Sequence, residues 1–448
     1  MRKIITLGFI FCFFGNSFLF SQDYGQGFSG IVSQVFDDRY YDRVFDLDFA
    51  IADPTAMGMG GAFVAVANDA QATLWNPAGL TRLTKIQGQV VIQLDFDQRL
   101  YTEAENSGIK VLSEPKPLFT FPSLALVLPF SIQSRNLALG FSYLKLNNAN
   151  SEVEDTEYYF GGSKILEVNE RMGGTDAVST SIAFELIEQL SLGFTYNYLF
   201  GNDDFDFRIK SPYADNITYL YFSDKEEVSG NFVNIGILAN PLKWISLGAN
   251  ITPSWTYTIK ENKEKIVSLS YDSDVGYSEL VFETPEDELE KFEFKQPLKF
   301  DVGVAIKPIQ SLTLAMSYEM DDWEGVEIIR NDEKVDNNMT NVASWRYGLE
   351  YLATSGVTIV PLRLGYYTHD LPFKDMYFEG TYYGQQIERT YWTLGIGMYK
   401  EKVKIDFAYQ NGIQEFSKWM RSQDYYNDRL FKTKDTFNQV LLKVTYEL

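Results

Sequence analysis

The chain has 448 residues, a formal net charge of −22, 16% aromatic residues and one cysteine. So acidic a protein is a poor ligand for nucleic acid, because phosphate contacts need clustered Lys and Arg. One cysteine excludes internal disulfides and thiolate metal sites, and no apolar stretch after the N-terminal segment is long enough for a membrane-spanning helix. We expect no cofactor.

The first element is an export signal. Arg2 and Lys3 precede an apolar run from Ile4 to Phe14, which predicts a secretory signal peptide over residues 1–21 with cleavage after Ser21. The alternative, a membrane anchor, needs about 20 uninterrupted apolar residues, and this run is broken from Gly15 onward. Because Cys12 lies in the signal, the mature chain is expected to contain no thiol.

Residues 22–84 form the second predicted unit. The stretch 52–80 is rich in Gly and Ala, carries few charges, and ends in Asn76-Pro77-Ala78-Gly79. Small residues of this kind suit tight burial in a confined space, and the Asn-Pro-Ala-Gly sequence is typical of a turn. The pattern predicts a compact segment that ends just before the first strand.

Residues 85–448 show a repeated hairpin pattern. Leu192, Phe194 and Tyr196, for example, alternate with Gly193 and Thr195, so that each predicted strand has one apolar and one polar face. About fourteen strands of about nine to twelve residues are expected, a length that crosses a bilayer at a tilt. They are placed near 85–100, 118–129, 136–146, 177–187, 190–200, 231–241, 245–256, 297–307, 312–322, 344–353, 358–369, 389–399, 403–410 and 436–448.

The connections between these strands alternate between short and long. The long segments, 147–176, 201–230, 257–296 and 411–435, are predicted to be extracellular loops, so that the short turns and both termini are periplasmic. Four tryptophans near strand ends are expected to belong to an interfacial aromatic girdle, with core packing as the alternative: Trp244, Trp255, Trp345 and Trp392. The fold class is therefore an all-β antiparallel transmembrane barrel surrounded by outer-membrane lipid.

The polar faces predict what fills the lumen. Glycines recur on them at similar heights, at Gly140, Gly193 and Gly248, which makes room for a plug. Mid-strand charges also face inward: Arg346, Glu350 and Arg363. Either they line a polar path for a solute or they form internal ion pairs that support a plug, and we favour pairing because an unpaired buried charge is costly.

One segment of the chain resembles part of a known protein family. Residues 58–80, above all Asn76-Pro77-Ala78-Gly79, resemble the plug of the long-chain fatty-acid transporter (FadL) superfamily, which also contains the secretion protein PorV. The resemblance implies a barrel of fourteen strands with Asn76, Pro77, Ala78 and Gly79 in a plug motif. It further implies passive passage of a hydrophobic small molecule past a movable plug and out through a lateral gap that the sequence does not locate.

The PorV branch implies a different function, because Gly58 to Asp69 resembles that branch as closely. Under this alternative the barrel is an outer-membrane component that binds cargo or a translocon of a secretion system. The terminal Leu448 departs from the terminal Phe usual in such barrels.

Catalytic and metal chemistry have little support in the sequence. His369 is the only histidine and no Gly-x-Ser-x-Gly motif accompanies it, so we predict that the protein is not an enzyme. The predicted loop 257–296 contains a run of acids: Glu286, Asp287, Glu288, Glu290 and Glu293. Calcium favours clustered carboxylates, but the spacing matches no calcium loop, and we favour a solvated loop face.

Overall fold

A computed structural model describes residues 53–448 apart from residues 97, 104–109, 114–116, 149–150, 161–162, 214–215, 273–275, 284–290, 336–338, 379–380 and 421–428. The predicted signal peptide and residues 22–52 of the predicted plug lie outside the described residues. So do four acids of the predicted loop cluster, Glu286, Asp287, Glu288 and Glu290.

The described chain begins with three short helical segments: α3 (Pro54–Gly58), α4 (Ala72–Trp75) and the 3-10 helix η1 (Pro77–Arg82). Asp53 caps α3, because its carboxylate accepts hydrogen bonds from the backbone N–H groups of Thr55 and Ala56, and Pro54 supplies a helical φ. Within the described residues, no helix combines the length and hydropathy needed to span a bilayer. These segments form the plug, defined here as residues 53–84.

All strands after the plug join one antiparallel sheet that closes when β1 (Gln87–Asp95) pairs with β22 (Arg429–Glu447). The barrel wall has fourteen strand positions. Between β1 and β22 they are β4 (Leu118–Ile132), β5 (Arg135–Asn148), β7 (Ser163–Ile187), β8 (Leu190–Tyr213), β9 (Asn216–Leu242), β10 (Ile245–Thr252) with β11 (Trp255–Asp272), β13 (Lys291–Gln296) with β14 (Lys299–Ile309), β15 (Leu312–Asp321), β18 (Val342–Ser355), β19 (Thr358–Phe378), β20 (Thr381–Lys400) and β21 (Val403–Met420).

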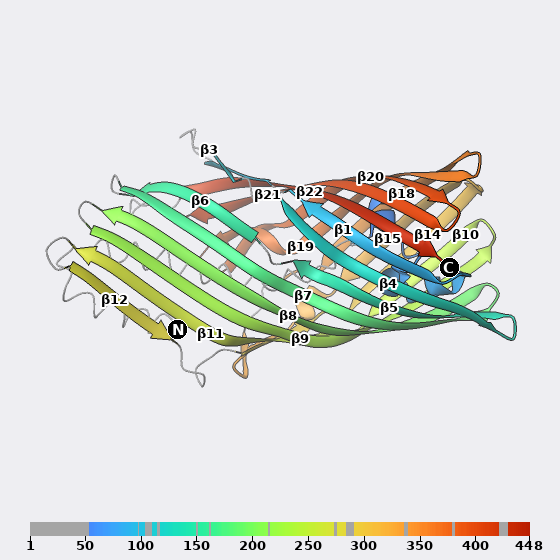
Figure 1. Ribbon diagram of the computed structural model, residues 1–448, viewed down its shortest axis with the longest axis horizontal. Coiled ribbons are helices and arrows are strands. Elements are labelled where there is room, and N and C mark those ends of the chain that lie inside the picture. The colour runs from blue at the N-terminus through green and yellow to red at the C-terminus, as the bar shows by residue number, and fades with distance from the viewer. Residues whose placement is uncertain are drawn as a thin grey trace.

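Smaller elements lie beyond this wall: β2 (Gln98–Glu103), β3 (Lys110–Ser113), β6 (Ser151–Phe160), β12 (Gly276–Glu283), β16 (Ile328–Arg330), β17 (Glu333–Val335) and the 3-10 helix η3 (Trp323–Gly325). Figure 1 shows the barrel with tight turns at the end that holds the C-terminus and long strands at the other. We call these the turn end and the extended end.

The wall follows the predicted alternation. In β8, Phe194, Tyr196 and Tyr198 are exposed on the outer face, whereas Thr195 and Asn197 are fully buried inside. Successive side chains of a strand point to opposite faces, so the register of a strand decides both which side chains face the lipid and which face the lumen. The outer face is therefore an apolar band and the inner face is largely polar. The prediction of an all-β barrel of fourteen strands is confirmed.

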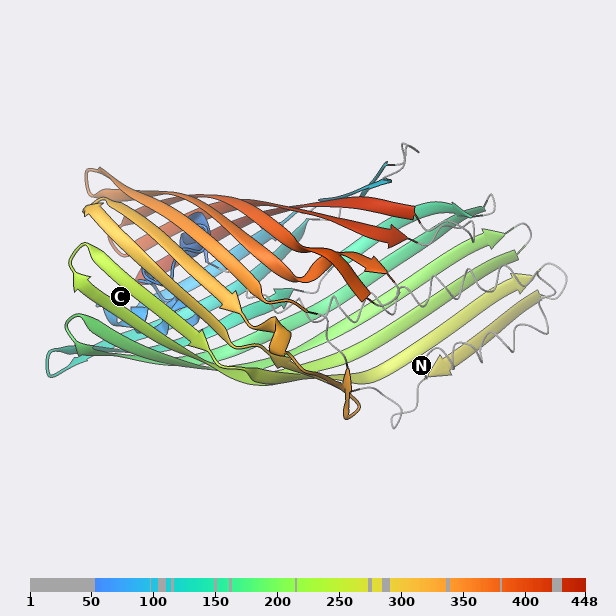
Figure 2. The same ribbon diagram turned by 180° about the vertical axis from the view of Figure 1, so that it is seen from behind.

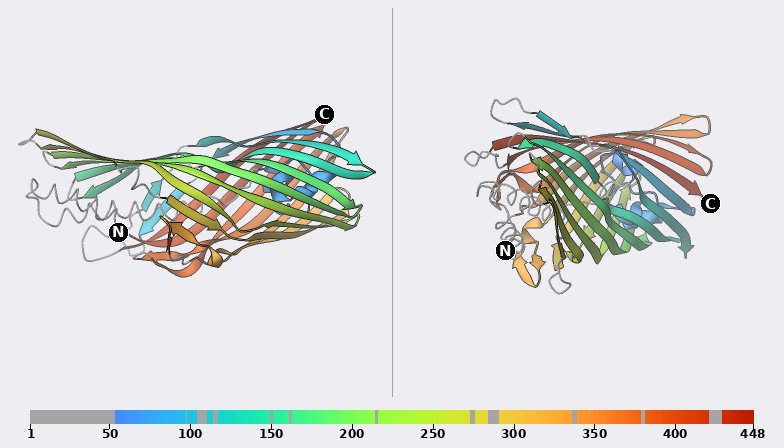
Figure 3. Two further views of the ribbon diagram at one scale, coloured as in Figure 1. Left: turned by 90° about the horizontal axis from the view of Figure 1, so that it is seen from below. Right: turned by 60° about the vertical axis from the view of Figure 1, so that its left-hand side comes forward.

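The prediction that the long segments are loops was wrong. Residues 201–213 continue β8, and their ladder with β7 runs on to the pair Leu166 and Lys210. The ladder between β8 and β9 continues to Tyr213 and Asn216. Polar sequence ends the apolar band but not the hydrogen bonding between strands, so β7, β8, β9 and β11 rise as a curved sheet beyond the barrel (Figure 3).

Two tryptophans of the predicted girdle lie elsewhere. Trp244, in the turn between β9 and β10, lines a space between the wall and the plug. Trp345 and Trp392 are exposed on the outer face, but Trp255 is only 9% exposed and points into the lumen. The predicted continuous strand 245–256 is interrupted between Thr252, where β10 ends, and Trp255, where β11 begins. The interruption changes which face the following side chains occupy.

Candidate functional site

The plug lies inside the barrel near the turn end, where Figures 1 and 2 show the helical segments enclosed by the strands. The plug packs against glycines on the inner face of the wall. A Cβ atom at Gly193 would overlap the backbone of Pro77 and Ala78, and one at Gly248 would overlap Val64. A Cβ at Gly140 would lie 2.8 Å from the methyl group of Thr73. Three predicted lumen glycines are thus points where the plug meets the wall.

The predicted plug motif occupies the start of η1. The Asn76 side chain accepts a hydrogen bond from the N–H of Ala78 at 3.1 Å, and its amide group donates to Val64 O at 2.7 Å and to Ile237 O of β9 at 3.0 Å. Asn76 is fully buried, as are Pro77, Ala78 and Gly79. The motif therefore caps a helix and joins it both to the rest of the plug and to the wall.

A buried ion cluster ties the start of the plug to the last strand. The ammonium group of Lys443 lies 2.6 Å from the carboxylate of Asp53 and 2.7 Å from that of Asp69, and it donates to the Thr55 hydroxyl at 2.5 Å. Lys443 is 1% exposed. Charge buried this deeply is tolerated only when it is paired and hydrogen-bonded, so the two carboxylates fix where the plug lies.

The predicted lumen charges form two separate groups. Arg363 donates to Glu350 and Asp406, both at 2.8 Å, within the wall. Arg346 instead pairs with Glu319 at 3.0 Å, and its guanidinium lies 5.7 Å from the ring of Trp75 in the plug. Arg346 therefore contacts the plug near Trp75, whereas Arg363 lies against Gly58 of the plug and joins Glu350 to Asp406 in the wall. A sequence pattern of inward charges cannot assign such partners.

His369 is part of a third polar contact, in which its Nδ1 lies 2.6 Å from the hydroxyl of Ser344. Ser344 is fully buried on β18, one strand away. Both side chains are buried on the inner face of the wall.

Apolar side chains fill the lumen on the extended side of the plug. We call this set the lumen apolar cluster: Leu144, Leu146, Ala177, Leu199, Val228, Phe232, Trp255, Tyr257, Ile259, Phe292, Phe294, Trp323, Val326, Ile328, Met339, Val342, Leu371 and Ile387. Its rings stack in succession, with centroids 4.7 Å apart for Phe232 and Trp255 and 5.1 Å apart for Tyr257 and Phe294. Leu74 of α4 packs against both this cluster and the plug core.

The wall is interrupted beside this cluster. The ladder between β4 and β5 ends at the pair Ser123 and Leu144. Both strands continue, β4 back to Leu118 and β5 on to Asn148, without pairing to each other. Residues 118–120 of β4 still pair with β1, so the interruption is confined to the β4–β5 seam. Leu144 and Leu146 place the lumen apolar cluster directly at it.

One group of acids gathers inside the extended end. The carboxylates of Asp224, Glu226 and Glu261, from β9 and β11, are buried and lie within 4.8 Å of one another. All three have further interactions with other parts of the chain, so their proximity does not identify a metal site. Sequence reasoning missed this group because it assigned residues 201–230 and 257–296 to loops.

The comparisons with known proteins agree with this geometry. The BamG family model matches residues 53–358. No curated protein sequence matches the chain. A solved FadL homologue from Pseudomonas aeruginosa is 12% identical with a TM-score of 0.60, and the match covers 88% of this chain and 98% of the homologue.

Two toluene transporters are also similar in structure. TodX of P. putida is 11% identical with a TM-score of 0.62, over 88% of this chain and 97% of TodX. TbuX of Ralstonia pickettii is 11% identical with a TM-score of 0.53, over 90% of this chain and 99% of TbuX. At these identities the likeness shows the fold alone, which is a FadL-type outer-membrane barrel with a plug-like N-terminal segment.

Proposed function

We propose that this chain, which belongs to the BamG family, is an outer-membrane transport protein for hydrophobic small molecules of the fatty-acid or aromatic type. We place the turn end, with both termini of the mature chain, in the periplasm, and the extended end outside the cell. The domain division that goes with this proposal is a signal peptide at 1–21, an N-terminal plug segment at 22–84, which includes the plug as defined above, and the barrel at 85–448.

The observation that carries the proposal is the position of Leu144 and Leu146. They belong to the lumen apolar cluster and also lie where the β4–β5 ladder ends. A hydrophobic ligand gains roughly 25 cal/mol for each Å² of apolar surface it removes from water, so it would pack among these side chains. From there the interrupted seam leads sideways toward the lipid, and the ligand need not cross the polar lumen.

The plug is held too firmly to leave the barrel in each transport event. Removing one partner of a buried ion pair costs about 3–5 kcal/mol, and Lys443 has two such partners in the plug. We infer a local shift instead. Leu74 contacts both the plug core and the lumen apolar cluster, so a ligand that displaces Leu74 acts on α4 while both anchors remain in place.

The test is retention and saturable binding of an apolar ligand. Purified full-length protein is examined by native mass spectrometry, and then a fluorescent fatty acid is titrated into protein in lipid vesicles and displaced with unlabelled fatty acid or an alkyl aromatic. Saturable binding that is lost when Leu146 is charged supports the proposal. Absence of both a retained lipid and saturable binding contradicts it.

A second candidate function is protein binding, as in the PorV-like secretion components. It is favoured by β6 and β12, each of which pairs on one side only within the described part of the sheet, with β7 and β11 respectively. Open strand edges readily accept an extended strand of another protein. Crosslinking from β12 in intact membranes, followed by identification of the partner, tests this function independently of ligand binding.

A further inference from the structure

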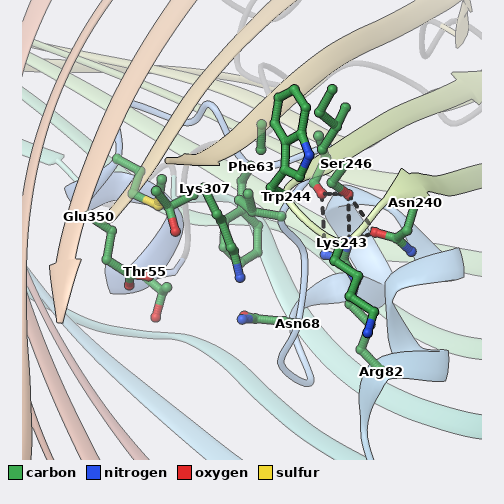
Figure 4. Close-up of a pocket in the computed structure, with 16 residues that line it drawn as sticks. Thr55, Phe63, Asn68, Arg82, Asn240, Lys243, Trp244, Ser246, Lys307 and Glu350 are labelled. Atoms are coloured by element: carbon green, nitrogen blue, oxygen red, sulfur yellow. Dashed lines mark hydrogen bonds between the residues drawn. The ribbon is translucent and has the colours of Figure 1, made fainter. Parts of the chain in front are cut away.

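A pocket of about 200 Å³ lies between the plug and the wall on the turn side, opposite the lumen apolar cluster. The plug contributes Met59, Phe63 and Val66 to its lining. The wall contributes residues from the turn between β9 and β10 and from the end of β14, including Trp244 and Lys307 (Figure 4). One side of the pocket is therefore apolar.

Three cations line the same pocket. Lys243 and Lys307 are exposed, and neither makes an ion pair with any residue that the structure describes. Arg82 donates to Ala65 O, to the Asn240 side chain at 2.8 Å and to the Ser246 hydroxyl at 2.6 Å. These acceptors are all neutral, so the positive charge of Arg82 is not balanced by an ion pair.

The one carboxylate in the lining of this pocket does not neutralise the three cations. Glu350 is the only acidic side chain in the lining, and it lies 2.8 Å from Arg363 in the wall. The pocket lining thus combines apolar side chains with an excess of positive charge. This combination matches a ligand that has a negative head and a compact apolar body, because each part would replace water with a suitable partner.

We infer that this pocket binds a small organic monocarboxylate, with the carboxylate between Lys243 and Lys307 and the apolar body against Phe63 and Trp244. The volume is below the roughly 300–1,000 Å³ of sites for drug-sized ligands, which favours an acid the size of benzoate or hexanoate. The ligand would contact plug and wall together and would therefore stabilise the seated plug. This site is separate from the apolar path proposed above and does not depend on it.

The experiment titrates benzoate and hexanoate into full-length protein in detergent and measures binding by calorimetry and by the thermal unfolding midpoint. The variant is Lys243→Gln combined with Lys307→Gln, and the matched control is Lys402→Gln, an exposed lysine in another turn at this end. We expect the double variant to bind at least about tenfold more weakly, a loss of about 1.4 kcal/mol, and the control to bind as the wild type does. The ligand should raise the unfolding midpoint of the wild type but not of the double variant.

Two comparisons make the test decisive. Benzyl alcohol, which keeps the ring but lacks the charge, should bind more weakly than benzoate, and added salt should weaken benzoate binding because exposed charges are screened. Equal binding of benzoate by the wild type and the double variant would overturn the inference, as would no binding of either acid. Because Leu146 lies on the other side of the plug, charging it should leave benzoate binding unchanged even if fatty-acid binding is lost.

Discussion

The ammonium group of Lys443, on the last strand, lies 2.6 Å from the carboxylate of Asp53, at the first helix of the plug. The two residues are 390 positions apart in the chain. The contact therefore forms only when the barrel has closed around the plug. It joins the two ends of the described fold and suggests that plug seating and barrel closure are one cooperative event.

The first prediction concerns this contact. Lys443→Met should lower the free energy of unfolding by about 3–5 kcal/mol, because Asp53 and Asp69 would remain buried without their cation. Thermal unfolding followed by circular dichroism measures the change. The control is Lys434→Met, which removes an exposed pair with Glu415 and should cost no more than about 1 kcal/mol. Similar losses in both variants would show that Lys443 is not an anchor.

The second prediction concerns the fit between plug and wall. Gly193→Ala places a methyl group on the backbone of Pro77 and Ala78, so the barrel should fold while the plug is displaced. A cysteine introduced at Thr73, which is fully buried, reports the displacement by faster maleimide labelling. Gly88→Ala is the control, because a Cβ there meets no atom within 4 Å. Equal labelling rates in the two variants would contradict a tight fit at Gly193.

The third prediction concerns the plug motif. Asn76→Asp keeps an oxygen that accepts from Ala78 but loses the amide donor to Val64 O and Ile237 O, and it places a negative charge beside two carbonyl oxygens. A buried acceptor left without its partner costs about 1–3 kcal/mol, so the variant should unfold at a lower temperature. Asn68→Asp is the control, because Asn68 is exposed. If both variants unfold at the wild-type temperature, Asn76 does not hold the plug.

The sequence predicts the barrel well because one local rule governs most of it. The alternation of apolar and polar side chains along β8 assigns its two faces without knowledge of the neighbouring strands. A shift of the register by one residue would expose every buried side chain of the strand. Glycines that face the lumen predict a plug because a missing side chain leaves room for a segment packed against the wall, as Pro77 and Ala78 pack against Gly193. The resemblance of residues 58–80 to FadL plugs also predicts a plug, from the sequence of the plug itself instead of the wall.

The parts that sequence reasoning missed depend on long-range pairing. Polar residues after Phe200 read as a loop, although they continue a ladder whose partners lie in β7 and β9. The inward position of Trp255 depends on a two-residue interruption that carries no strong turn signal beyond Pro253. The pairing of Arg346 with Glu319 follows from the neighbouring positions of β15 and β18, which alternation along single strands cannot specify.

The last prediction tests the proposed path at the interrupted seam. Leu146 is 3% exposed and belongs to the lumen apolar cluster, so Leu146→Glu places a charge where a hydrophobic ligand would pass. We expect the affinity for a fluorescent fatty acid, and its rate of entry into vesicles, to fall at least about tenfold, because burying a ligand against an unpaired carboxylate costs more than 1.4 kcal/mol.

The control for this variant is Val357→Glu, a change at a turn residue that is 81% exposed and distant from the seam. It should leave the affinity for the fluorescent fatty acid and its rate of entry into vesicles unchanged. Circular dichroism and resistance to unfolding in detergent establish that each variant has formed a barrel before uptake is compared. If Leu146→Glu folds and still takes up fatty acid at the wild-type rate, the ligand does not cross at the β4–β5 seam. Retained saturable binding in that variant would further show that the ligand binds away from Leu146.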